Sequence, residues 1–133
     1  MIFVDTGAFI GRFLIRDQYH DRALRLWEKI QAESESCCTS NFVLDETFTL
    51  LARRSSYKFA TEKARLIYAR SQVQIFRPTQ PEEVAAVALF EKFADQKVSF
   101  TDCISFILMR NAGVKTAFSF DHHFQRAGFR LWS

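Results

Sequence analysis

Short apolar runs alternate along this chain with longer stretches in which apolar residues recur at helical spacing. The first run, Ile2-Phe3-Val4, stops at Asp5, and similar runs lie near residues 36–39, 73–76, 115–120 and 129–132. The stretch 20–31 carries apolar side chains three and four positions apart, which is typical of an amphipathic helix. Strands separated by helices predict an α/β fold, in which a parallel sheet of about five strands has helices on both faces.

The boundaries of the remaining helices follow from capping residues. Ser40 or Asn41 can begin a helix that runs to Arg54, and residues 56–70 form the next one. The spacing of Thr79 and Glu82 is that of a capping box, and it predicts a helix to about residue 94. The helix over 99–112 is apolar nearly all round, so we expect it inside the protein. A short helical turn is expected over 122–127.

Composition indicates an ordinary globular protein. The 133 residues are 48% hydrophobic and 25% charged, which fits one domain spanning 1–133 and excludes disorder. The longest apolar run, 84–90, is far shorter than the ~20 residues of a membrane span. With no signal-peptide pattern at its start, the chain is expected to be cytoplasmic. The three cysteines have neither disulfide nor zinc spacing and are expected to be buried thiols.

The net charge of +3 conceals a basic segment. Residues 47–80 carry seven cations against Glu62 alone, a local charge of +6. Such a segment attracts phosphates or an acidic partner, although a solvated outer face of two helices would have the same composition. The cations are Arg53, Arg54, Lys58, Lys63, Arg65, Arg70 and Arg77.

Four acids occupy equivalent places in the predicted fold. Asp5 and Asp121 each follow an apolar strand, so in a parallel sheet they lie at the same edge. Asp102 begins the buried helix, which starts at that edge too. Glu46 lies on the inward stripe of its helix, where an ionised carboxylate is costly unless it is paired or bound to metal. Its neighbour Asp45 is on another face and is expected to be solvated.

Converging carboxylates predict a divalent cation. Each carboxylate raises the pKa of the others unless a cation neutralises them, and Mg²⁺ or Mn²⁺ prefers oxygen ligands. Such an ion turns water into a nucleophile and stabilises charge on a phosphodiester. The sequence therefore predicts metal-dependent phosphodiester hydrolysis.

Helix capping is the structural alternative for three of these acids. Asp5 and Asp121 can cap the helices that follow them, and Ser99 and Asp102 have capping-box spacing. Glu46 is the exception, because no cap explains it and no basic residue lies three or four positions away.

Four segments taken together resemble the PIN-domain family, and within it the VapC-type toxins of prokaryotic toxin-antitoxin pairs. The segments are residues 3–6, 41–47, 99–103 and 120–124, with Gly128-Phe129 after them. The resemblance implies a three-layer sandwich with a five-stranded parallel sheet and an acidic pocket that binds one or two Mg²⁺ or Mn²⁺ ions. It also implies an RNA endonuclease, usually a homodimer, that a small antitoxin protein neutralises.

Carried over position by position, the resemblance assigns catalysis and metal binding to Asp5, Glu46, Asp102 and Asp121. Asp5, Asp102 and Asp121 are expected to hold the metal directly. Glu46 would complete the pocket or orient the attacking water, and in-line attack would leave a 5′-phosphate and a 3′-hydroxyl.

Other positions have supporting roles in this prediction. Thr6 and Thr101 stand where the family often has a small polar residue near the metal or the scissile phosphate. The basic segment, Arg53 and Arg54 included, would follow the RNA backbone or receive the antitoxin. His122 and His123 are expected on the surface or behind the ligands, because an oxygen-rich site needs no imidazole.

Two other functions compete with a nuclease. Asp5-Thr6-Gly7 matches the Asp-Thr-Gly of aspartic proteases, but those are all-β proteins with two such loops, and this chain has one copy. The second alternative is a non-catalytic α/β module that binds protein or RNA through the basic segment, with the acids serving as caps.

Overall fold

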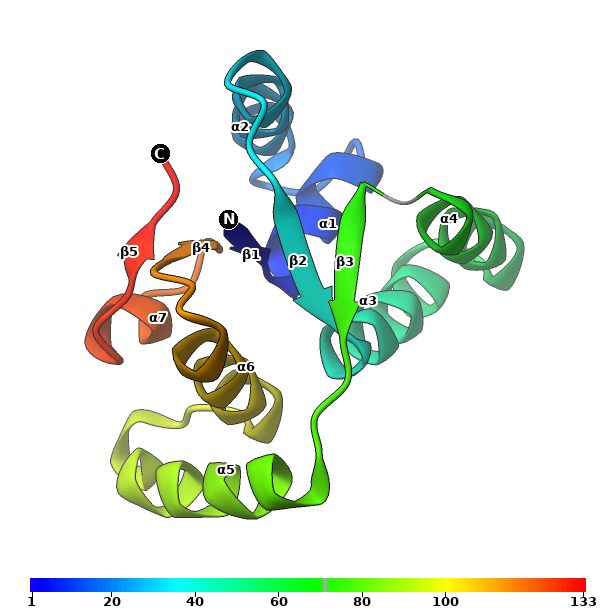
Figure 1. Ribbon diagram of the computed structural model, residues 1–133. Coiled ribbons are helices and arrows are strands. Elements are labelled where there is room, and N and C mark those ends of the chain that lie inside the picture. Colours follow the sequence, from blue (N-terminus) through cyan, green and yellow to red (C-terminus); the bar gives the residue numbers. More distant parts are fainter. Residues whose placement is uncertain (71) are drawn as a thin grey trace.

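A fully parallel sheet forms the middle layer of the protein (Figure 1). The computed structural model describes residues 1–70 and 72–133. In this part of the chain the strand order is β3-β2-β1-β4-β5, and every neighbouring pair is parallel. The predicted five-strand parallel sheet is confirmed. The strands are β1 (Ile2–Val4), β2 (Cys37–Ser40), β3 (Val73–Phe76), β4 (Thr116–Phe118) and β5 (Arg130–Leu131).

Helices cover both faces of the sheet, which confirms the three-layer sandwich. The chain steps from β1 to β2 to β3 in one direction and then returns to continue through β4 and β5. Because such crossovers are right-handed, α1 to α4 lie on one face and α5 to α7 on the other (Figure 1). The helices are α1 (Thr6–Phe13), α2 (His20–Ala32), α3 (Asn41–Arg54), α4 (Tyr57–Ala69), α5 (Gln80–Lys92), α6 (Phe100–Ala112) and α7 (His123–Arg126).

Local signals set the helix ends. The Ser40 hydroxyl accepts a hydrogen bond from the backbone N–H of Val43, so Ser40 rather than Asn41 caps α3. Thr79 and Glu82 form the predicted capping box. Gly113 ends α6 at φ 70°, a left-handed conformation that glycine adopts without steric cost. The helix expected to reach about residue 94 ends instead at Lys92, and a 3₁₀ turn, η1 (Ala94–Gln96), follows.

The strand expected over 115–120 is shorter than predicted. β4 covers only Thr116–Phe118, and Val4 at the end of β1 pairs with Phe118. Because β1 stops there, nothing on that side continues the ladder, and Ser119 and Phe120 leave the sheet. These two residues therefore belong to the connection that leads to Asp121, which makes them available to a site at this edge.

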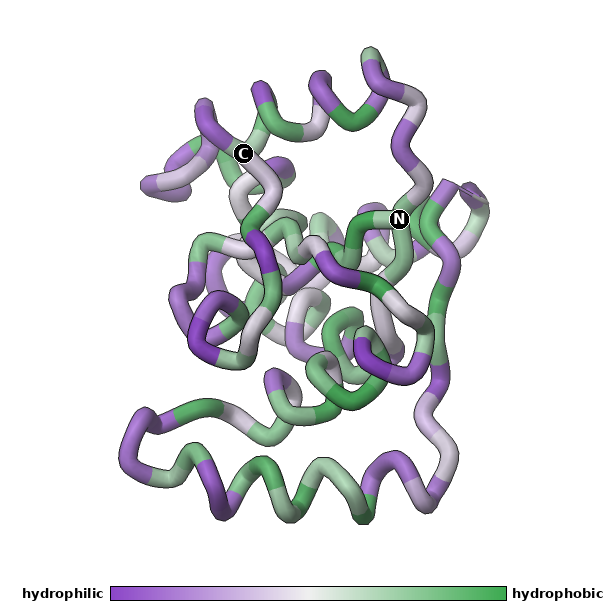
Figure 2. The backbone as a smooth tube through the Cα atoms, turned by 60° about the vertical axis from the view of Figure 1, so that its left-hand side comes forward, coloured by the Kyte–Doolittle hydropathy of each residue, from purple (hydrophilic) through white to green (hydrophobic). Residues whose placement is uncertain are grey.

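Aromatic side chains fill the core between the sheet and the helices. All of β1 is buried, and α6 is buried as predicted. The rings of Phe106 and Phe124 meet edge to face at 5.1 Å. In Figure 2 the hydrophobic segments gather at the centre of the molecule, whereas the peripheral helices alternate between hydrophobic and hydrophilic residues. Across the described residues, no helix has the length and apolar character needed to cross a membrane.

The strand order reverses between β1 and β4, and this point positions the site. β1 and β4 are neighbours, but the chain leaves them toward opposite faces, into α1 and α7. The backbone N–H of Asp5 donates to the carbonyl of Phe118 at 3.0 Å, which ties the two strand ends together. In open α/β sheets, ligands bind in the crevice outside such a reversal.

Candidate active site

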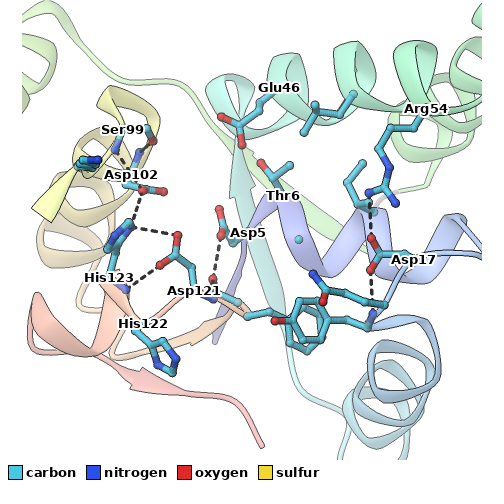
Figure 3. A pocket seen from close by; sticks show the side chains of 18 residues that line it. Asp5, Thr6, Asp17, Glu46, Arg54, Ser99, Asp102, Asp121, His122 and His123 are labelled. Carbon is cyan, nitrogen blue, oxygen red and sulfur yellow. Dashed lines mark hydrogen bonds and ion pairs between the residues drawn. The ribbon is translucent and has the colours of Figure 1, made fainter.

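A pocket of about 610 Å³ lies at this reversal, and all four predicted acids line it (Figure 3). They come from four distant segments: Asp5 follows β1, Glu46 lies on α3, Asp102 begins α6 and Asp121 follows β4. In Figure 3, Asp102 and Asp121 lie on one side, with Asp5 and Glu46 in the middle. The fold thus brings together the carboxylates that were expected at one sheet edge.

Asp5 is a buried carboxyl, and capping does not explain it. It occupies the N-cap position of α1, but its side chain makes no capping hydrogen bond. Instead it accepts a hydrogen bond from the Ser119 hydroxyl at 2.8 Å. Burial, and after it the charge of Asp102, raise the pKa of Asp5 to about 7 against the lowering effect of the Ser119 hydrogen bond. The Asp5 side chain therefore favours a nearby cation.

Asp102 both caps its helix and faces the pocket. Ser99 and Asp102 form the capping box expected in the structural alternative, with Asp102 N–H to Ser99 Oγ at 3.0 Å and Ser99 N–H to Asp102 Oδ2 at 3.4 Å. The residue is 8% exposed. Burial and then the charge of Asp121 raise the pKa of Asp102, while bonds from Ser99 and His123 lower it. Capping therefore accounts for the position of Asp102 but not for its acidic surroundings.

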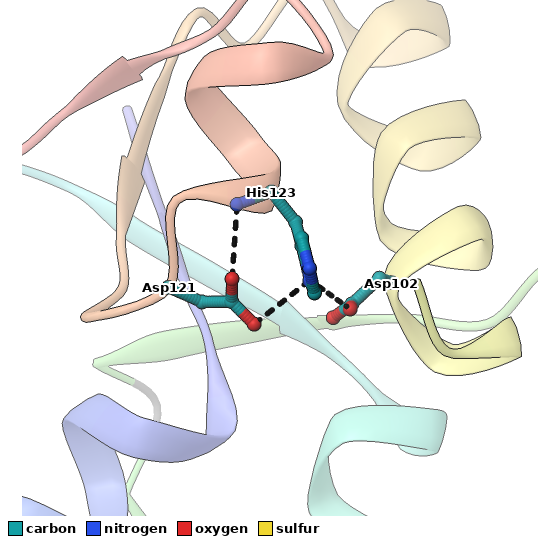
Figure 4. A group of neighbouring side chains, drawn as sticks. All are labelled: Asp102, Asp121 and His123. Atoms are coloured by element: carbon teal, nitrogen blue, oxygen red, sulfur yellow. Dashed lines mark hydrogen bonds and ion pairs between the residues drawn. The ribbon is translucent and has the colours of Figure 1, made fainter. Parts of the chain in front are cut away.

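Asp121 is held by a short network at the end of β4 (Figure 4). Its backbone N–H donates to Ser119 Oγ at 3.0 Å, and its Oδ1 accepts from the backbone N–H of His123 at 2.9 Å. His123 Nδ1 lies 3.0 Å from Asp121 Oδ2 and 3.3 Å from Asp102 Oδ2. The imidazole therefore bridges the two acids, whereas His122 is exposed at the rim of the pocket.

Glu46 is less buried than its position on the inward stripe of α3 predicted. It lies on α3 between Phe42 and Leu50, and all three are only partly buried because the pocket opens over this face of the helix. Asp45 is exposed, as expected. The Glu46 side chain therefore enters the pocket from α3, and its carboxylate points toward Asp5 and Asp102 (Figure 3).

Thr6 and Thr101 are placed differently from each other. Thr6 lines the pocket, is 6% exposed, and its hydroxyl has no hydrogen-bond partner among the described residues. Thr101 is not one of the lining residues. It precedes Asp102 on α6, so the two side chains point about 100° apart around the helix, and Ser99 fills that part of the wall instead.

Arg53 and Arg54 also lie in different hollows of the surface. Arg53 is exposed and lines a different hollow, between α3 and α4, together with Tyr57. Arg54 does line the acidic pocket, but its guanidinium is paired with Asp17 at 2.9 Å. Of this pair, only Arg54 is therefore brought to the site.

Sequence reasoning missed Ser119, Asp17 and Tyr19, which all line the pocket. The only local signal for Ser119 is a polar residue inside the apolar run before Asp121. Its hydroxyl links Asp5 to Asp121 across the sheet reversal. Asp17 and Tyr19 lie in the loop between α1 and α2, where no periodicity points to a site.

The donor set fits a hard divalent cation. Oxygen atoms of Asp102 and Asp121 and a ring nitrogen of His123 lie within 4.8 Å of one another, close enough to share an ion. Asp5 and Glu46 line the same pocket outside this close group and bring two more carboxylates. The Thr6 hydroxyl, which has no partner among the described residues, brings a neutral oxygen. Such oxygen-rich sets suit Mg²⁺ or Mn²⁺, whereas the cysteines that would favour softer metals are buried elsewhere.

Comparison with known proteins agrees with this geometry. A family model described as "PIN domain" matches residues 2–130. The 23S rRNA-specific endonuclease VapC20 of Mycobacterium tuberculosis is 36% identical over 129 residues, which cover 97% of this chain and 95% of the relative. A crystal structure of VapC20 from the same species, described as a sarcin-ricin loop cleaving toxin, superposes with a TM-score of 0.88 at 34% identity, covering 97% and 96% of the two chains. The chain therefore belongs to the PIN-domain family and resembles its VapC-type members over nearly its full length.

Proposed function

We propose that this chain is an RNA endonuclease that depends on Mg²⁺ or Mn²⁺, one or two ions per site, and that residues 1–133 form its single catalytic domain. One observation carries the proposal: four carboxylates from four distant segments line one pocket at the sheet reversal. The pKa of Asp5 is raised first by burial and then by the charges of Asp102 and Glu46, and a cation in the pocket would offset both effects. An aspartic protease is excluded, because the sheet is parallel and the motif occurs once.

The relatives narrow the substrate class. They are described as a 23S rRNA-specific endonuclease and as a sarcin-ricin loop cleaving toxin. We propose that this chain likewise cuts a loop of ribosomal RNA, as a cytoplasmic toxin. By the same analogy it works as a homodimer that a small antitoxin protein neutralises.

Asp5, Asp102 and Asp121 are the proposed metal ligands. When bound, the ion lowers the pKa of a water molecule and offsets negative charge at the scissile phosphate. Ser119 holds the carboxyl of Asp5, and Ser99 and His123 hold that of Asp102. These partners fix the carboxylates before substrate arrives, which is the preorganisation that catalysis requires.

Glu46 and Thr6 line the same pocket and have no such partner among the residues that the structure describes. Glu46 is the proposed acceptor that orients the attacking water, because its carboxylate faces the other acids from α3 (Figure 3). The buried Thr6 hydroxyl is the proposed donor to the scissile phosphate. In-line attack then leaves a 5′-phosphate and a 3′-hydroxyl.

The test is cleavage of a pool of structured RNAs and of a sarcin-ricin stem-loop, with Mg²⁺, Mn²⁺ or EDTA. We expect discrete cuts that need metal and disappear in Asp102→Asn and Glu46→Gln. Asp45→Asn is the matched control, because this exposed acid is next to Glu46 and points away from the pocket. It should cut like the wild type.

The melting temperature separates the nuclease from the interaction module. In the nuclease, Asp102→Asn removes repulsion, so the metal-free protein should melt at a higher temperature while Mn²⁺ binding is lost. In the module the same change weakens only the capping box with Ser99, so the protein should melt slightly lower. A lower melting temperature combined with wild-type Mn²⁺ binding would remove Asp102 from the site.

A further inference from the structure

The pocket continues well beyond the acids. Its far end is lined by Asp17, Gln18 and Tyr19 from the loop between α1 and α2, and by Leu50 and Arg54 from α3. In Figure 3, Asp17 and Arg54 lie on the opposite side of the pocket from Asp102 and Asp121. None of these residues is needed to hold a metal, so this end of the pocket has no role in the function proposed above.

Two stacked aromatic rings, which we call the aromatic platform, form the part of the pocket wall that runs from the acids to the far end. The rings of Tyr19 and Phe120 are stacked, with centroids 4.4 Å apart and planes 11° from parallel. Phe120 directly precedes Asp121, so one edge of the platform adjoins an acid of the site. Both rings line the pocket and are only partly buried. The platform thus offers apolar surface to a ligand that also reaches the acids.

The platform rests on two glycines of α1. A Cβ atom at Gly7 or at Gly11 would lie 3.5 Å from the Phe120 ring. The Phe120 ring therefore lies close to this face of α1, within contact distance of a single Cβ atom. Because α1 supports one side of the Phe120 ring, Phe120 is a rigid partner for Tyr19. Binding to a rigid stacking surface loses little conformational entropy.

The far end is close to electrically neutral. Arg54 Nη1 is 2.9 Å from Asp17 Oδ1, and the other oxygen of Asp17 accepts from the backbone N–H of Tyr19 at 3.0 Å. The ion pair therefore neutralises the charge of Arg54 and fixes the loop to α3. A phosphate would gain little there, whereas a neutral ring beside the amide of Gln18 fits the chemistry.

We propose that this end of the pocket binds one unpaired nucleobase of the RNA, from a nucleotide adjacent to the scissile phosphate. The base stacks on the platform of Tyr19 and Phe120, and the Gln18 amide hydrogen-bonds to its edge. Aromatic side chains recognise unstacked RNA bases in this way. The inference deepens the proposed nuclease function, since it requires the phosphate of the same RNA to lie at the acids.

The first test measures cleavage of intact RNA, and of RNAs that lack one base, by the wild type and a protein variant. Wild type and Tyr19→Leu are assayed on an intact substrate and on substrates that carry an abasic nucleotide on either side of the cut. On intact RNA we expect kcat/KM to fall about 10- to 100-fold in Tyr19→Leu, the size expected when one base has no ring to stack on. On one of the abasic RNAs the wild type should lose a similar factor, and Tyr19→Leu should then cost about twofold or less.

Conservative variants distinguish stacking from a folding role. Tyr19→Phe keeps the ring and should restore most of the activity. Gln18→Ala should change the preference among the four bases at that position while the melting temperature stays at the wild-type value, because Gln18 is exposed. Phe90→Leu, an exposed aromatic on α5, is the control and should cleave both RNAs like wild type. Equal losses for Tyr19→Leu on intact and abasic RNA would overturn the proposal.

A binding measurement keeps the subsite testable even if no RNA is cut. In EDTA, the four nucleoside 5′-monophosphates and ribose 5-phosphate are titrated against the protein by NMR. We expect at least one nucleotide to bind more tightly than ribose 5-phosphate, and Tyr19→Leu to remove that difference. Equal binding of all five ligands by wild type would overturn the base subsite, whereas failure of cleavage with base-dependent binding intact would count against the nuclease function alone.

Discussion

Asp5 makes the stability of the metal-free protein depend on pH. Its pKa rises from 3.8 to about 7 in the folded state, chiefly because it is buried. Between these values the folded protein holds a proton that the unfolded chain has lost. The contribution of Asp5 to stability is therefore complete below pH 3.8 and is lost as the pH rises through 7, at a slope of roughly 1.4 kcal/mol per pH unit.

We therefore expect the metal-free protein to melt at lower temperature as the pH rises from about 5 to about 8, and Mn²⁺ to raise the melting temperature most at the upper end. Proton and metal compete for the same carboxylates. Thermal melts at several pH values, with EDTA or Mn²⁺, measure both effects. Asp5→Asn, which cannot titrate, should flatten the metal-free profile. A profile equally steep in wild type and variant would show that other groups cause it.

Thr6 offers a test that separates function from stability. Its hydroxyl is buried without a partner in the described part of the chain, which costs about 1–3 kcal/mol of desolvation. Thr6→Val keeps the shape and removes the polar atom, so the free energy of unfolding should stay equal or rise. If the hydroxyl contacts the substrate, kcat/KM should fall about 10-fold or more. Denaturant unfolding and cleavage kinetics check the two expectations, and Thr6→Ser should keep activity.

For individual residues, the sequence predicts the charged groups of the site better than the neighbouring residues that hold those groups in place. Asp5, Asp102 and Asp121 could be placed because strand ends and helix starts meet at one edge of a parallel sheet. Ser119 could not, because its link to Asp5 joins residues 114 positions apart. The ion pair of Asp17 with Arg54 was equally hidden, since it depends on how a loop folds back onto α3. Contacts of this kind leave no local pattern.

Alanine substitutions at two glycines of α1 test how closely this helix packs against its neighbours. A Cβ at Gly11 would lie 2.8 Å from the Cβ of Ala23 on α2, closer than packed side chains allow. Gly11→Ala should therefore push α1 and α2 apart and destabilise the protein by about 1–3 kcal/mol. At Gly7 the nearest atom, on Phe120, would be 3.5 Å away, an ordinary contact. Gly7→Ala should be neutral or slightly stabilising, because alanine favours helices.

Chemical denaturation of Gly7→Ala and Gly11→Ala measures their free energies of unfolding and so tests these two expectations. The two substitutions are identical and lie one helical turn apart, so differences in helix propensity largely cancel. If both variants lose the same stability, helix packing is not the cause. Loss of nuclease activity in Gly11→Ala at temperatures where it remains folded would further show that the spacing of α1 and α2 sets the loop carrying Asp17 and Tyr19.

Elements were predicted well where capping residues marked their ends. Ser40 and Thr79, both candidate caps in the sequence, begin helices α3 and α5 through contacts within one turn. Strand ends were harder to predict. β4 stops at Phe118 because its partner β1 stops at Val4, and such pairing is a property of the sheet rather than of the 115–120 run itself.

Across the whole molecule, an acidic pocket is set in a basic protein. The net charge is +3, and residues 47–80 alone carry +6, while the four site acids gather at the sheet reversal. The exposed cations of this segment include Lys58 and Arg65 on α4. We expect such a distribution to draw RNA to the protein through the basic segment, with divalent cations neutralising the acids that would otherwise repel its phosphates.

If the basic segment follows the RNA backbone, binding should weaken steeply with salt. In EDTA, replacing Lys58 and Arg65 by Gln should lower RNA affinity and reduce the slope of log K against log salt by about 0.7 for each phosphate that is no longer neutralised. Lys115 is the matched control: it is exposed just before β4, at the edge of the sheet opposite the acids, so Lys115→Gln should leave the slope unchanged. An unchanged slope in the α4 double variant would show that Lys58 and Arg65 do not contact the RNA backbone, and it would leave these cations available to the antitoxin proposed above.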